Sequence, residues 1–536
     1  MVDSDDDSDY KPQRNESWNE NQSISSDEDA GSNGASGDDE EEESRSSSSS
    51  SVLNDLEEST RSILSELIES IQYGLATERC RMYPDEVLLK DYEGWTSMHF
   101  LCMTLGRDTE LSLDLVHAMI KAVPLSKSMS DHDNSGNTPF HYFCEDVLYA
   151  SHMPTMITIL ELFLNDERSN VAEYVNNESM LPLHTIFCCS DSALKPLPSA
   201  SELLAVIHKV LHAYPAAASK ACSESGMLPL HMACRYFVPN LVDNENLHKA
   251  IVEVMKSLIL SFPDAVTKRD LSNRFPLHHL SKHADPAHNP AISDIYHLLI
   301  EHNPSLVMKR NRWGESPIDT FWVEHVDGEL IDDVKFKVGE VMLRAAYWGA
   351  LEDSSIGLKW LPIHAAVRST CPRNFLEELV RRYPKQLTMR DENGDTPLHI
   401  YLQYRLHEGT YDREDYREEY RIKFLFILLQ NHRIASMPDA CGRLPLHIAL
   451  ERGCLDWENG LRLLTDSAPT AVSTRDIESH FYPFMFAAMA FRLDLCYQLL
   501  RNSPGVLGML SLSLSESSGD CSSKTDAIRK SKRQRK

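Results

Sequence analysis

The sequence predicts an all-α fold, a solenoid in which pairs of helices are stacked and joined by tight turns. The main observation is a short phrase, Pro-Leu-His followed by a small apolar residue, which recurs eight times in full or as a near copy. An active site occurs once in a chain, so a phrase that recurs this often indicates a unit of architecture. The histidines of the phrase are His99, His141, His184, His231, His278, His364, His399 and His447.

A second observation is the regular return of this phrase. Its proline position falls ten times along the chain, at steps of 35 to 48 residues. Repeated units stack on their neighbours and bury one extended core, so a chain of 536 residues needs no division into separate globular domains. We therefore expect about ten units. The ten positions are Ser97, Pro139, Pro182, Pro229, Pro276, Pro317, Pro362, Pro397, Pro445 and Pro483.

A third observation is the turn that precedes the phrase, with the pattern Asp-x-x-Gly, as at Asp391 and Gly394. The Asp carboxylate can accept hydrogen bonds from nearby backbone N–H groups, and Gly supplies the positive φ that a tight turn needs. The proline of the phrase then stands at the first position of a helix, where its missing N–H costs nothing. Each turn therefore leads directly into a helix.

A second apolar helix completes each unit, and it ends at an aromatic residue followed by proline, as at Tyr83-Pro84. We expect this pair to end the helix and to begin a short extended arm toward the next turn. Four of five such prolines stand seven residues before the Asp or Asn of the turn, whereas Pro215 is one residue further away. The variation in length is expected between the histidine phrase and the next aromatic-proline pair.

The stretch 391–400, Asp-Glu-Asn-Gly-Asp-Thr-Pro-Leu-His-Ile, resembles the ankyrin repeat, whose family pattern is D-x-x-G-x-T-P-L-H-x-A. Similar stretches extend over residues 91 to about 505. The resemblance implies β-turn fingers that project from paired antiparallel helices, and a curved solenoid with a concave binding face. It also implies that the histidine of the phrase is bonded to the backbone at the turn.

Several units depart from the family pattern. Leu replaces Thr before the proline in four copies, where the histidine loses the usual hydroxyl and must find another acceptor. Asp319 and Met485 stand where histidine is expected, and the unit before Leu361 lacks the Asp-x-x-Gly turn. We therefore expect a degenerate junction near residues 320–360, interpreted as a bend between two sub-arrays, and a capping unit at the end.

These patterns divide the chain into five segments. Residues 1–51 are an acidic, Ser-rich segment whose first fifty residues carry sixteen acidic and three basic side chains, so we expect disorder. Residues 52–90 are expected to form an N-terminal capping helix and lead-in, with one helix up to about Thr77. Residues 91–350 and 351–510 are the first and second sub-arrays, and residues 511–536 are a disordered basic tail.

Charge and composition restrict the functional classes. A formal net charge of -28 argues against a general nucleic-acid-binding protein, whose usual mark is a basic face. The N-terminus lacks the basic and apolar regions of a signal peptide, and no run of 18 apolar residues occurs. We therefore expect an intracellular protein with no membrane segment, in which the twelve cysteines are reduced and mostly buried.

The C-terminal tail is basic in an otherwise acidic chain. Residues 524–536 contain seven basic groups and one acidic group, a composition typical of a nuclear import signal or a polyanion-binding tail. The alternative is a solvated end that offsets the acidic N-terminus. We favour nuclear import, with an importin as the partner and the nucleus as the location. The residues concerned are Arg529, Lys530, Lys532, Arg533, Arg535 and Lys536.

Catalytic and metal chemistry find little support in the sequence. The densest histidine cluster, His278-His279 with His283 and His288, lacks cysteine partners at zinc-finger spacing, and His278 already belongs to the phrase. No phosphate-binding Gly-rich loop, nucleophile elbow or HExxH motif occurs. We expect no catalytic residues, no metal and no cofactor.

The function that the sequence predicts is a non-catalytic scaffold or adaptor that binds another protein, with a monomeric chain. Trp and Arg at the turns are the expected contact residues, because both types are enriched in interface hot spots; packing inside the repeats is the structural alternative. Other functional hypotheses are a nuclear factor that contacts nucleic acid through its basic tail, and a targeting subunit of a separate enzyme. The expected contact residues are Trp95, Arg274, Arg312, Trp313 and Arg443.

Overall fold

The fold was analysed in a computed structural model, in which all described residues belong to one unit of the chain, Ser59–Lys536. The N-terminal segment 1–51 and the tail 511–536 lie outside the described residues, as do the six basic residues of the import hypothesis. The described residues are 61–105, 113–165, 170–188, 198–240, 247–287, 290–326, 331–348, 361–369, 371–405, 422–453 and 455–508.

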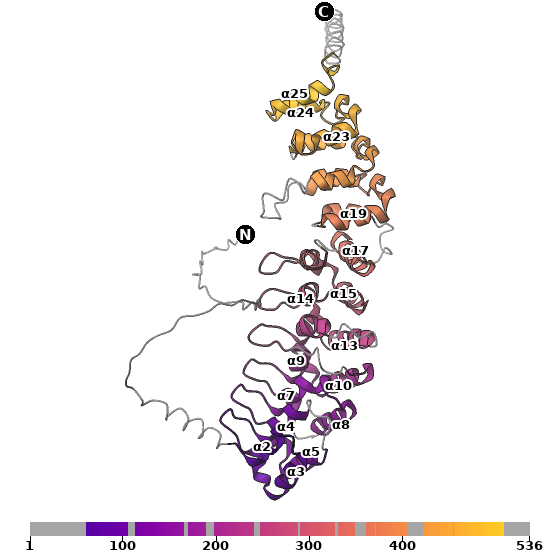
Figure 1. The fold of residues 1–536 in the computed structure, drawn as a ribbon. Helices are drawn as coiled ribbons and strands as arrows, with labels where there is room; N and C mark the ends of the chain where they lie inside the picture. Colours follow the sequence, from indigo (N-terminus) through magenta and orange to yellow (C-terminus); the bar gives the residue numbers. More distant parts are fainter. Residues whose placement is uncertain are drawn as a thin grey trace, which may run out of the picture. The chain divides into compact units, whose positions relative to one another are not determined.

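The described residues form helix pairs joined by turns and contain no β-strand (Figure 1). In most units a first helix begins at the proline of the phrase, because proline satisfies the first helical position without an N–H. These first helices are α4 (Ser97–Leu105), α7 (Pro139–Asp146), α9 (Pro182–Phe187), α11 (Pro229–Met232), α14 (Pro276–His283), α16 (Pro317–Phe321), α18 (Pro362–Arg368), α20 (Pro397–Ile400), α22 (Pro445–Arg452) and α24 (Pro483–Met489).

The second helices lie on the side away from the turns (Figure 1). Between units, first helices pack against first helices and second helices against second helices, as in the pairs α4 with α7 and α13 with α15. The expected stacked, all-α architecture is confirmed. The second helices are α5 (Leu113–Ala122), α8 (Met153–Leu164), α10 (Ala200–Ala213), α13 (His248–Ser261), α15 (Pro290–His302), α17 (Asp333–Trp348), α19 (Arg373–Arg382), α23 (Arg462–Ser467) and α25 (Leu493–Asn502), together with a helical segment over residues 422–428.

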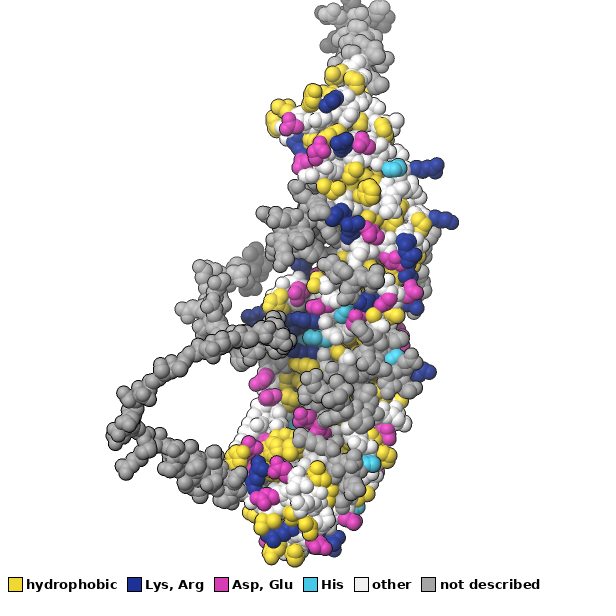
Figure 2. All heavy atoms as spheres, viewed as in Figure 1, with side chains coloured by type: hydrophobic (Ala, Val, Ile, Leu, Met, Phe, Trp, Pro, Cys, Tyr) yellow, Lys and Arg dark blue, Asp and Glu magenta, His cyan; other side chains and the backbone are white. Residues whose placement is uncertain are grey.

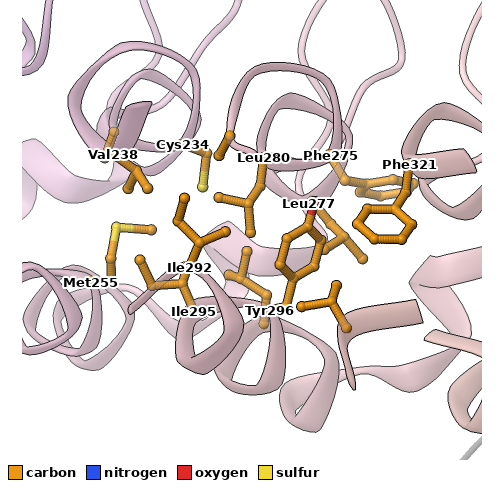
Figure 3. Packing of buried hydrophobic residues seen from close by; sticks show 14 of the residues in the cluster. Cys234, Val238, Met255, Phe275, Leu277, Leu280, Ile292, Ile295, Tyr296 and Phe321 are labelled. Carbon is orange, nitrogen blue, oxygen red and sulfur yellow. The ribbon is translucent and has the colours of Figure 1, made fainter. Parts of the chain in front are cut away.

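One apolar core runs between the two rows of helices. Figure 3 shows the part between α13, α14 and α15, where Leu280 from α14 faces Ile292 and Ile295 from α15. All three side chains are fully buried. Neighbouring units share this core, since the ring of Tyr296 lies 5.8 Å from the ring of Phe321 in the next unit. Each unit therefore depends on its neighbours for burial of its apolar faces.

The prediction of one N-terminal helix up to about Thr77 is wrong. Two helices are present, α2 (Ile63–Glu69) and α3 (Tyr73–Met82). Ile71 between them has φ 61°, and the N–H groups of Ile71 and Gln72 donate to the carbonyls of Ile68 and Leu67. This is a Schellman ending, which usually has glycine at the left-handed position. Apolar residues continue at helical spacing on both sides of this ending, so the sequence alone resembles that of one continuous helix.

The prediction that an extended arm starts directly after each aromatic-proline pair is also wrong. The proline instead begins a single turn of 3₁₀-helix. Proline fixes a φ that suits the start of a helix, and the residue before it stays extended; only the residues after this turn lead as an extended strand-like segment into the finger. These turns are η2 (Pro84–Leu88), η5 (Pro215–Ser219), η8 (Pro263–Thr267), η9 (Pro304–Met308), η12 (Pro384–Thr388), η14 (His432–Ser436) and η16 (Pro469–Ser473).

The seven-residue spacing is more regular in the structure than the Asp-x-x-Gly pattern predicts. Cys222, seven residues after Pro215, donates its N–H to the carbonyl of Met227 and so occupies the place of the turn Asp. That turn has one extra residue, since Gly226 bonds back to Cys222. The 3₁₀ turns at His432 and Pro469 were missed because no aromatic-proline pair marks them, although each stands seven residues before an Asp.

Longer units widen their helices with π-helical segments, which accommodate inserted residues. Three of these segments directly follow a first helix, between the phrase and the next 3₁₀ turn, where the variation in length was expected. They are η6 (Ala233–Phe237), η10 (Trp322–Val326) and η13 (Tyr401–Arg405), with a further segment at η15 (Trp457–Leu461). Other short segments are α6 (Leu125–Ser128), η3 (Val147–Tyr149), η4 (Val171–Glu173) and α12 (Val238–Asn240).

In the described part of the degenerate region, aromatic packing joins η10, α17 and α19. Helix α17 packs against α15 before it and α18 after it. The Trp322 ring lies 4.8 Å from the ring of Phe375, and Phe336 stacks on the same ring at 5.3 Å. Gly339 of α17 makes this approach possible, because a Cβ there would lie 2.6 Å from Phe375. The proposed boundary between sub-arrays falls on residues 349–360, outside the described residues.

Candidate protein-interaction surface: the fingers and first helices

Most described fingers are built by one carboxylate or amide that collects backbone N–H groups; the finger that begins at Cys222 is the exception. Asp91 Oδ1 accepts from the N–H groups of Glu93 (3.0 Å) and Trp95 (2.8 Å), and Gly94 donates its own N–H to the Asp91 carbonyl. Gly94 has φ +82°, as the turn requires. In the finger that begins at Asp270 the left-handed position is filled by Asn273, a residue type that tolerates this conformation.

Neighbouring fingers are joined to one another by backbone hydrogen bonds. The N–H of the second residue of each finger donates to the carbonyl of the third residue of the preceding finger. In one case the acceptor is the fourth residue instead, Ser225. We call this series the backbone ladder. It connects fingers between residues 91 and 315 and fixes the spacing of their tips. Its bonds are Asn134 to Glu93 (2.9 Å), Asn177 to Ser135 (3.1 Å), Ser223 to Glu178 (2.7 Å), Leu271 to Ser225 (2.9 Å) and Arg312 to Ser272 (3.1 Å).

The side-chain pattern does not predict the backbone ladder, because backbone atoms supply both partners. Its one side-chain requirement is room for the next finger. A Cβ on Gly136 would lie 2.6 Å from the backbone nitrogen of Asn177, whereas a Cβ on Gly314 would meet nothing within 4 Å. The finger glycines therefore serve two purposes, since all need a positive φ and some also allow a close approach.

The histidines of the phrase bond each unit to the next. In every case Nε2 lies near a carbonyl at the base of the following finger, so Nε2 carries the proton and donates it. The distances are 3.1 Å (His99 to Asn137), 3.0 Å (His141 to Met180), 3.1 Å (His184 to Lys220), 3.2 Å (His231 to Lys268), 3.2 Å (His278 to Glu315), 3.1 Å (His364 to Met389), 3.3 Å (His399 to Arg443) and 3.0 Å (His447 to Thr474).

In all of these histidines except His364, the other ring nitrogen accepts a hydrogen bond from the start of its own helix. In a Thr copy, His99 Nδ1 lies 3.0 Å from the backbone nitrogen of Thr96 and 2.9 Å from its hydroxyl. In a Leu copy, His184 Nδ1 accepts from the backbone N–H of Leu181 alone, at 3.0 Å. The expectation that the Leu copies need another acceptor is therefore wrong: the Thr hydroxyl donates to Nδ1, and in both kinds of copy Nε2 donates to a carbonyl of the next unit.

Burial lowers the pKa of these histidines, because an imidazolium would lose its hydration inside the stack. The pKa falls to about 4 for His99 and His184 and to about 3 for His231. A backbone N–H that donates to Nδ1 also requires an unprotonated nitrogen there. The neutral form therefore dominates at physiological pH.

The unusual units keep part of this arrangement. Asp319 Oδ2, at the histidine position, accepts from the backbone N–H of Ser316 at 3.2 Å and from its hydroxyl at 2.7 Å. His364 keeps its bond to the next unit, but its Nδ1 has no partner in the described part of the chain. Leu361 at the helix start has ψ 79°, in contrast to 154° at Leu444, so its N–H has a different direction.

In the histidine cluster near residue 279, His279 forms a structural contact inside the chain. His279 Nε2 lies 2.9 Å from Asp270 Oδ2, and both side chains are buried. Burial alone would raise the pKa of Asp270, but hydrogen bonds from His279 and the Arg274 N–H hold it below its usual value. Over the described ranges, which exclude His288, no group of three His, Cys, Asp or Glu side chains is arranged for a metal.

The five expected contact residues lie in different surroundings. Trp95 is half-buried, and its ring lies 5.2 Å from Phe100 and 5.0 Å from Tyr142. Arg443 is 17% exposed and is paired with carboxylates. Trp313 is 57% exposed and Arg312 is exposed beside it. The structure brings Arg274, Arg312 and Trp313 together on two adjacent fingers, and it places Trp95 and Arg443 in other units.

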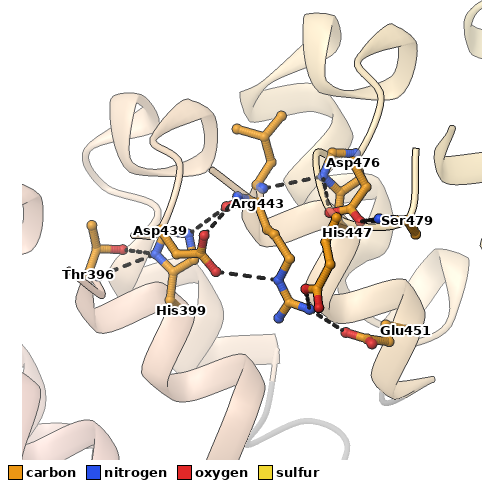
Figure 4. Close-up of polar contacts among 10 residues, drawn as sticks. Thr396, His399, Asp439, Arg443, His447, Glu451, Asp476 and Ser479 are labelled. Carbon is orange, nitrogen blue, oxygen red and sulfur yellow. Dashed lines mark hydrogen bonds and ion pairs between the residues drawn. The ribbon is translucent and has the colours of Figure 1, made fainter. Parts of the chain in front are cut away.

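Arg443 joins the last described fingers (Figure 4). Its guanidinium lies 3.4 Å from Asp439, 3.0 Å from Glu451 and 3.6 Å from Glu478. Its backbone carbonyl also accepts from His399 of the preceding unit. Its side chain is thus engaged in contacts within the chain, which corresponds to the packing alternative considered for these residues.

The fingers, the histidine bonds and the stacked helix pairs define an ankyrin-repeat fold. No protein-family model and no curated protein matches the sequence. Similar solved structures include the ankyrin repeat domain of Bcl-3 (15% identity, TM-score 0.32, 48% of this chain and 93% of that one). The human ASB11 ankyrin repeat domain aligns at 15% identity and TM-score 0.32, over 52% of this chain and 96% of that one.

A third similar structure is the Bd0816 predatory endopeptidase from Bdellovibrio bacteriovorus in complex with the immunity protein Bd3460. The matched chain is 13% identical, with TM-score 0.29, over 42% of this chain and 91% of that one. The fold assignment rests on the turns, histidine bonds and helix pairs of this chain itself. Among the described helices, none is both long and apolar enough to cross a membrane.

Proposed function

We propose that this chain is a non-catalytic scaffold or adaptor that binds another protein through its finger tips and first helices. The observation that carries the proposal is a division of roles within the fingers that begin at Asp270 and Asn311. The turn Asp and the phrase histidine are buried and bonded inside the chain, as at Asp270 and His278. Tip residues such as Leu271 (65% exposed) and Trp313 (57% exposed) project outward.

Exposed tip residues of this kind favour binding to a protein surface. Covering one large apolar side chain contributes about 1.5–3 kcal/mol, and Trp is among the residue types that most often dominate interfaces. The backbone ladder holds Leu271 and Arg312 in place before any partner arrives. The fingers then lose little conformational entropy on association, which favours affinity.

Affinity purification followed by quantitative mass spectrometry tests the proposal. The bait is the full chain, compared with a tip variant in which Leu271→Ser and Trp313→Ala are combined. The matched control is Leu260→Ser on α13, because Leu260 is 79% exposed but lies on a second helix, away from the fingers. Equal thermal unfolding of the variants would show that the fold is retained.

We expect at least one protein partner to be recovered with the full chain and the Leu260 variant and to be reduced about tenfold with the tip variant, as for loss of two anchor residues. Partners that depend on Leu260 and are indifferent to the tips would contradict the proposal.

The basic C-terminal run supports a separate proposal of nuclear import through an importin. Its support is compositional, with seven basic groups and one acidic group in residues 524–536. Removal of residues 529–536 from a fluorescent fusion should shift the protein from nucleus to cytoplasm. An unchanged distribution would reject this proposal and leave the finger proposal untouched.

A further inference from the structure

Two adjacent fingers concentrate positive charge on this acidic chain. Their arms and tips contain six Lys and Arg residues, which we call the basic finger pair. Five of the six are exposed and the sixth, Arg274, is half-buried. A group of Lys and Arg side chains is visible at the level of α14 on the face drawn in Figure 2. The six residues are Lys268, Arg269, Arg274, Lys309, Arg310 and Arg312.

The two fingers form one continuous surface. Arg312 donates its backbone N–H to Ser272 at 3.1 Å, which joins the tips. The Arg274 guanidinium lies 4.4 Å from the centre of the Trp313 ring, a cation–π contact that joins the same fingers through side chains. The charges of both fingers therefore face a partner together.

The carboxylates within these fingers are engaged elsewhere. Asp270 uses Oδ1 for the N–H groups of Ser272 and Arg274 and Oδ2 for His279. Glu315 Oε2 accepts from the Asn311 side chain at 3.1 Å. The structure shows no ion pair between the six basic side chains and any other described residue, in contrast to Arg443 with its three carboxylates.

Apolar surface lies among these charges. Leu271 and Trp313 are more than half exposed, and each stands at the tip of one of the two fingers. A surface that combines cations lacking a carboxylate partner with a large exposed ring and a Leu suits an anionic ligand that also carries apolar groups. An acidic protein segment has both features, whereas inorganic phosphate has only the charge.

We propose that the basic finger pair binds an acidic protein segment, rich in Asp and Glu, that places an apolar side chain against Trp313 and Leu271. This inference rests on the proposed function and specifies the partner's chemistry and the fingers that receive it. Nucleic acid is less suitable, because a chain with a net charge of -28 repels a polyanion beyond this small patch. A short acidic segment meets only the patch.

A fluorescein-labelled peptide that alternates Glu with Gly and carries two Leu residues tests the inference. About twelve residues are sufficient to cross both fingers, because an extended residue spans about 3.3–3.6 Å. Fluorescence anisotropy with the full chain should show binding that weakens severalfold when salt rises from about 50 to about 200 mM, since exposed ion pairs are screened. The same peptide with Gln in place of Glu should not bind.

The variant Arg310→Gln with Arg312→Gln should weaken binding of the acidic peptide about tenfold, through loss of two charges at the patch. The matched control is Lys249→Gln with Lys256→Gln on α13, which removes two exposed charges away from the fingers and should leave the affinity unchanged. An equal affinity for both variants would overturn the inference. Tighter binding of an oligothymidylate than of the acidic peptide would also overturn it.

The inference and the proposed function fail in different ways. If partner recovery depends on Leu271 and Trp313 but the acidic peptide does not bind, the finger proposal holds and the partner chemistry is wrong. If the peptide binds at the basic finger pair but no recovered partner depends on the tips, the inference holds and the scaffold proposal is wrong.

Discussion

The guanidinium of Arg274 lies 4.4 Å from the centre of the Trp313 ring, so that two side chains from successive units meet at the finger surface. Both were expected contact residues from their types and their places in the turn. Their pairing follows from the backbone ladder, which brings Ser272 and Arg312 within hydrogen-bonding distance. Trp313, the most exposed aromatic residue of the described fingers, is therefore held by its neighbour in a position open to a partner.

Stability should fall as the pH drops from 6.5 toward 4. Burial lowers the pKa of five phrase histidines to about 4 and of His231 to about 3. In the unfolded chain these groups have a pKa of about 6.5 and bind protons first, so acid favours unfolding by up to about 1.4 kcal/mol per pH unit for each histidine. Urea unfolding at a series of pH values measures this. A midpoint that stays constant between pH 7 and 5 would contradict the expectation.

A single histidine variant separates this effect from other titrating groups. His231→Gln should lower stability at neutral pH, because the Lys268 carbonyl loses a donor. The same variant should reduce the dependence of the unfolding free energy on pH. His117→Gln is the control, since His117 is exposed on α5 and its ring bonds to the Leu113 carbonyl of its own helix. It should unfold as the unaltered chain does at every pH.

Two finger glycines should respond differently to alanine. Gly136 and Gly314 have φ +77° and +83°, so each Ala variant should lose about 1–2 kcal/mol from backbone strain. Gly136→Ala should lose more, because its Cβ would lie 2.6 Å from the Asn177 nitrogen while the Gly314 site is open. Chemical denaturation measures both. Equal losses would mean that the fingers can separate without cost.

Helical glycines offer a second matched pair. Gly339→Ala should destabilise the chain by about 1–3 kcal/mol, since overpacking forces the Phe375 and Trp322 rings to move. Gly74→Ala, in α3 with nothing within 4 Å, should stabilise it by up to about 1 kcal/mol through helix propensity. Thermal unfolding would show opposite shifts. A neutral Gly339→Ala would refute tight packing at the degenerate region.

The turn between α2 and α3 should improve with glycine. Ile71 is 46% exposed and has φ 61°, a conformation that is costly for a β-branched residue. Ile71→Gly should therefore stabilise the chain by about 1 kcal/mol, because the left-handed conformation no longer costs energy. Urea unfolding of the full chain tests this, and a loss of stability would show that the exposed side chain contributes more than the strain removes.

The repeat period, the finger turns and the helix pairs could be predicted because local chemistry fixes them. Asp91 and Gly94 specify a turn, and Pro397 specifies a helix start, from their own side chains. The N-terminal segment was misread as one helix because Ile71 gives no sign of a left-handed conformation. Apolar residues on both sides of Ile71 continue the helical period through the break.

The surface was less predictable than the frame. The type of residue at a turn does not reveal whether its side chain meets solvent or another unit. Trp95 packs against Tyr142 of the next unit, and Arg443 meets Glu478 of the next finger, although both resemble contact residues in the sequence. Contacts between units join residues some forty positions apart, which no local pattern records.

Photo-crosslinking of the full chain in cells tests the central claim most directly, namely that the fingers carry the partner. A crosslinking amino acid is placed at Arg312, an exposed finger tip, or at Leu260, an exposed position on a second helix. We predict a crosslinked protein adduct from position 312 and none from position 260. Adducts from position 260 alone would contradict the account.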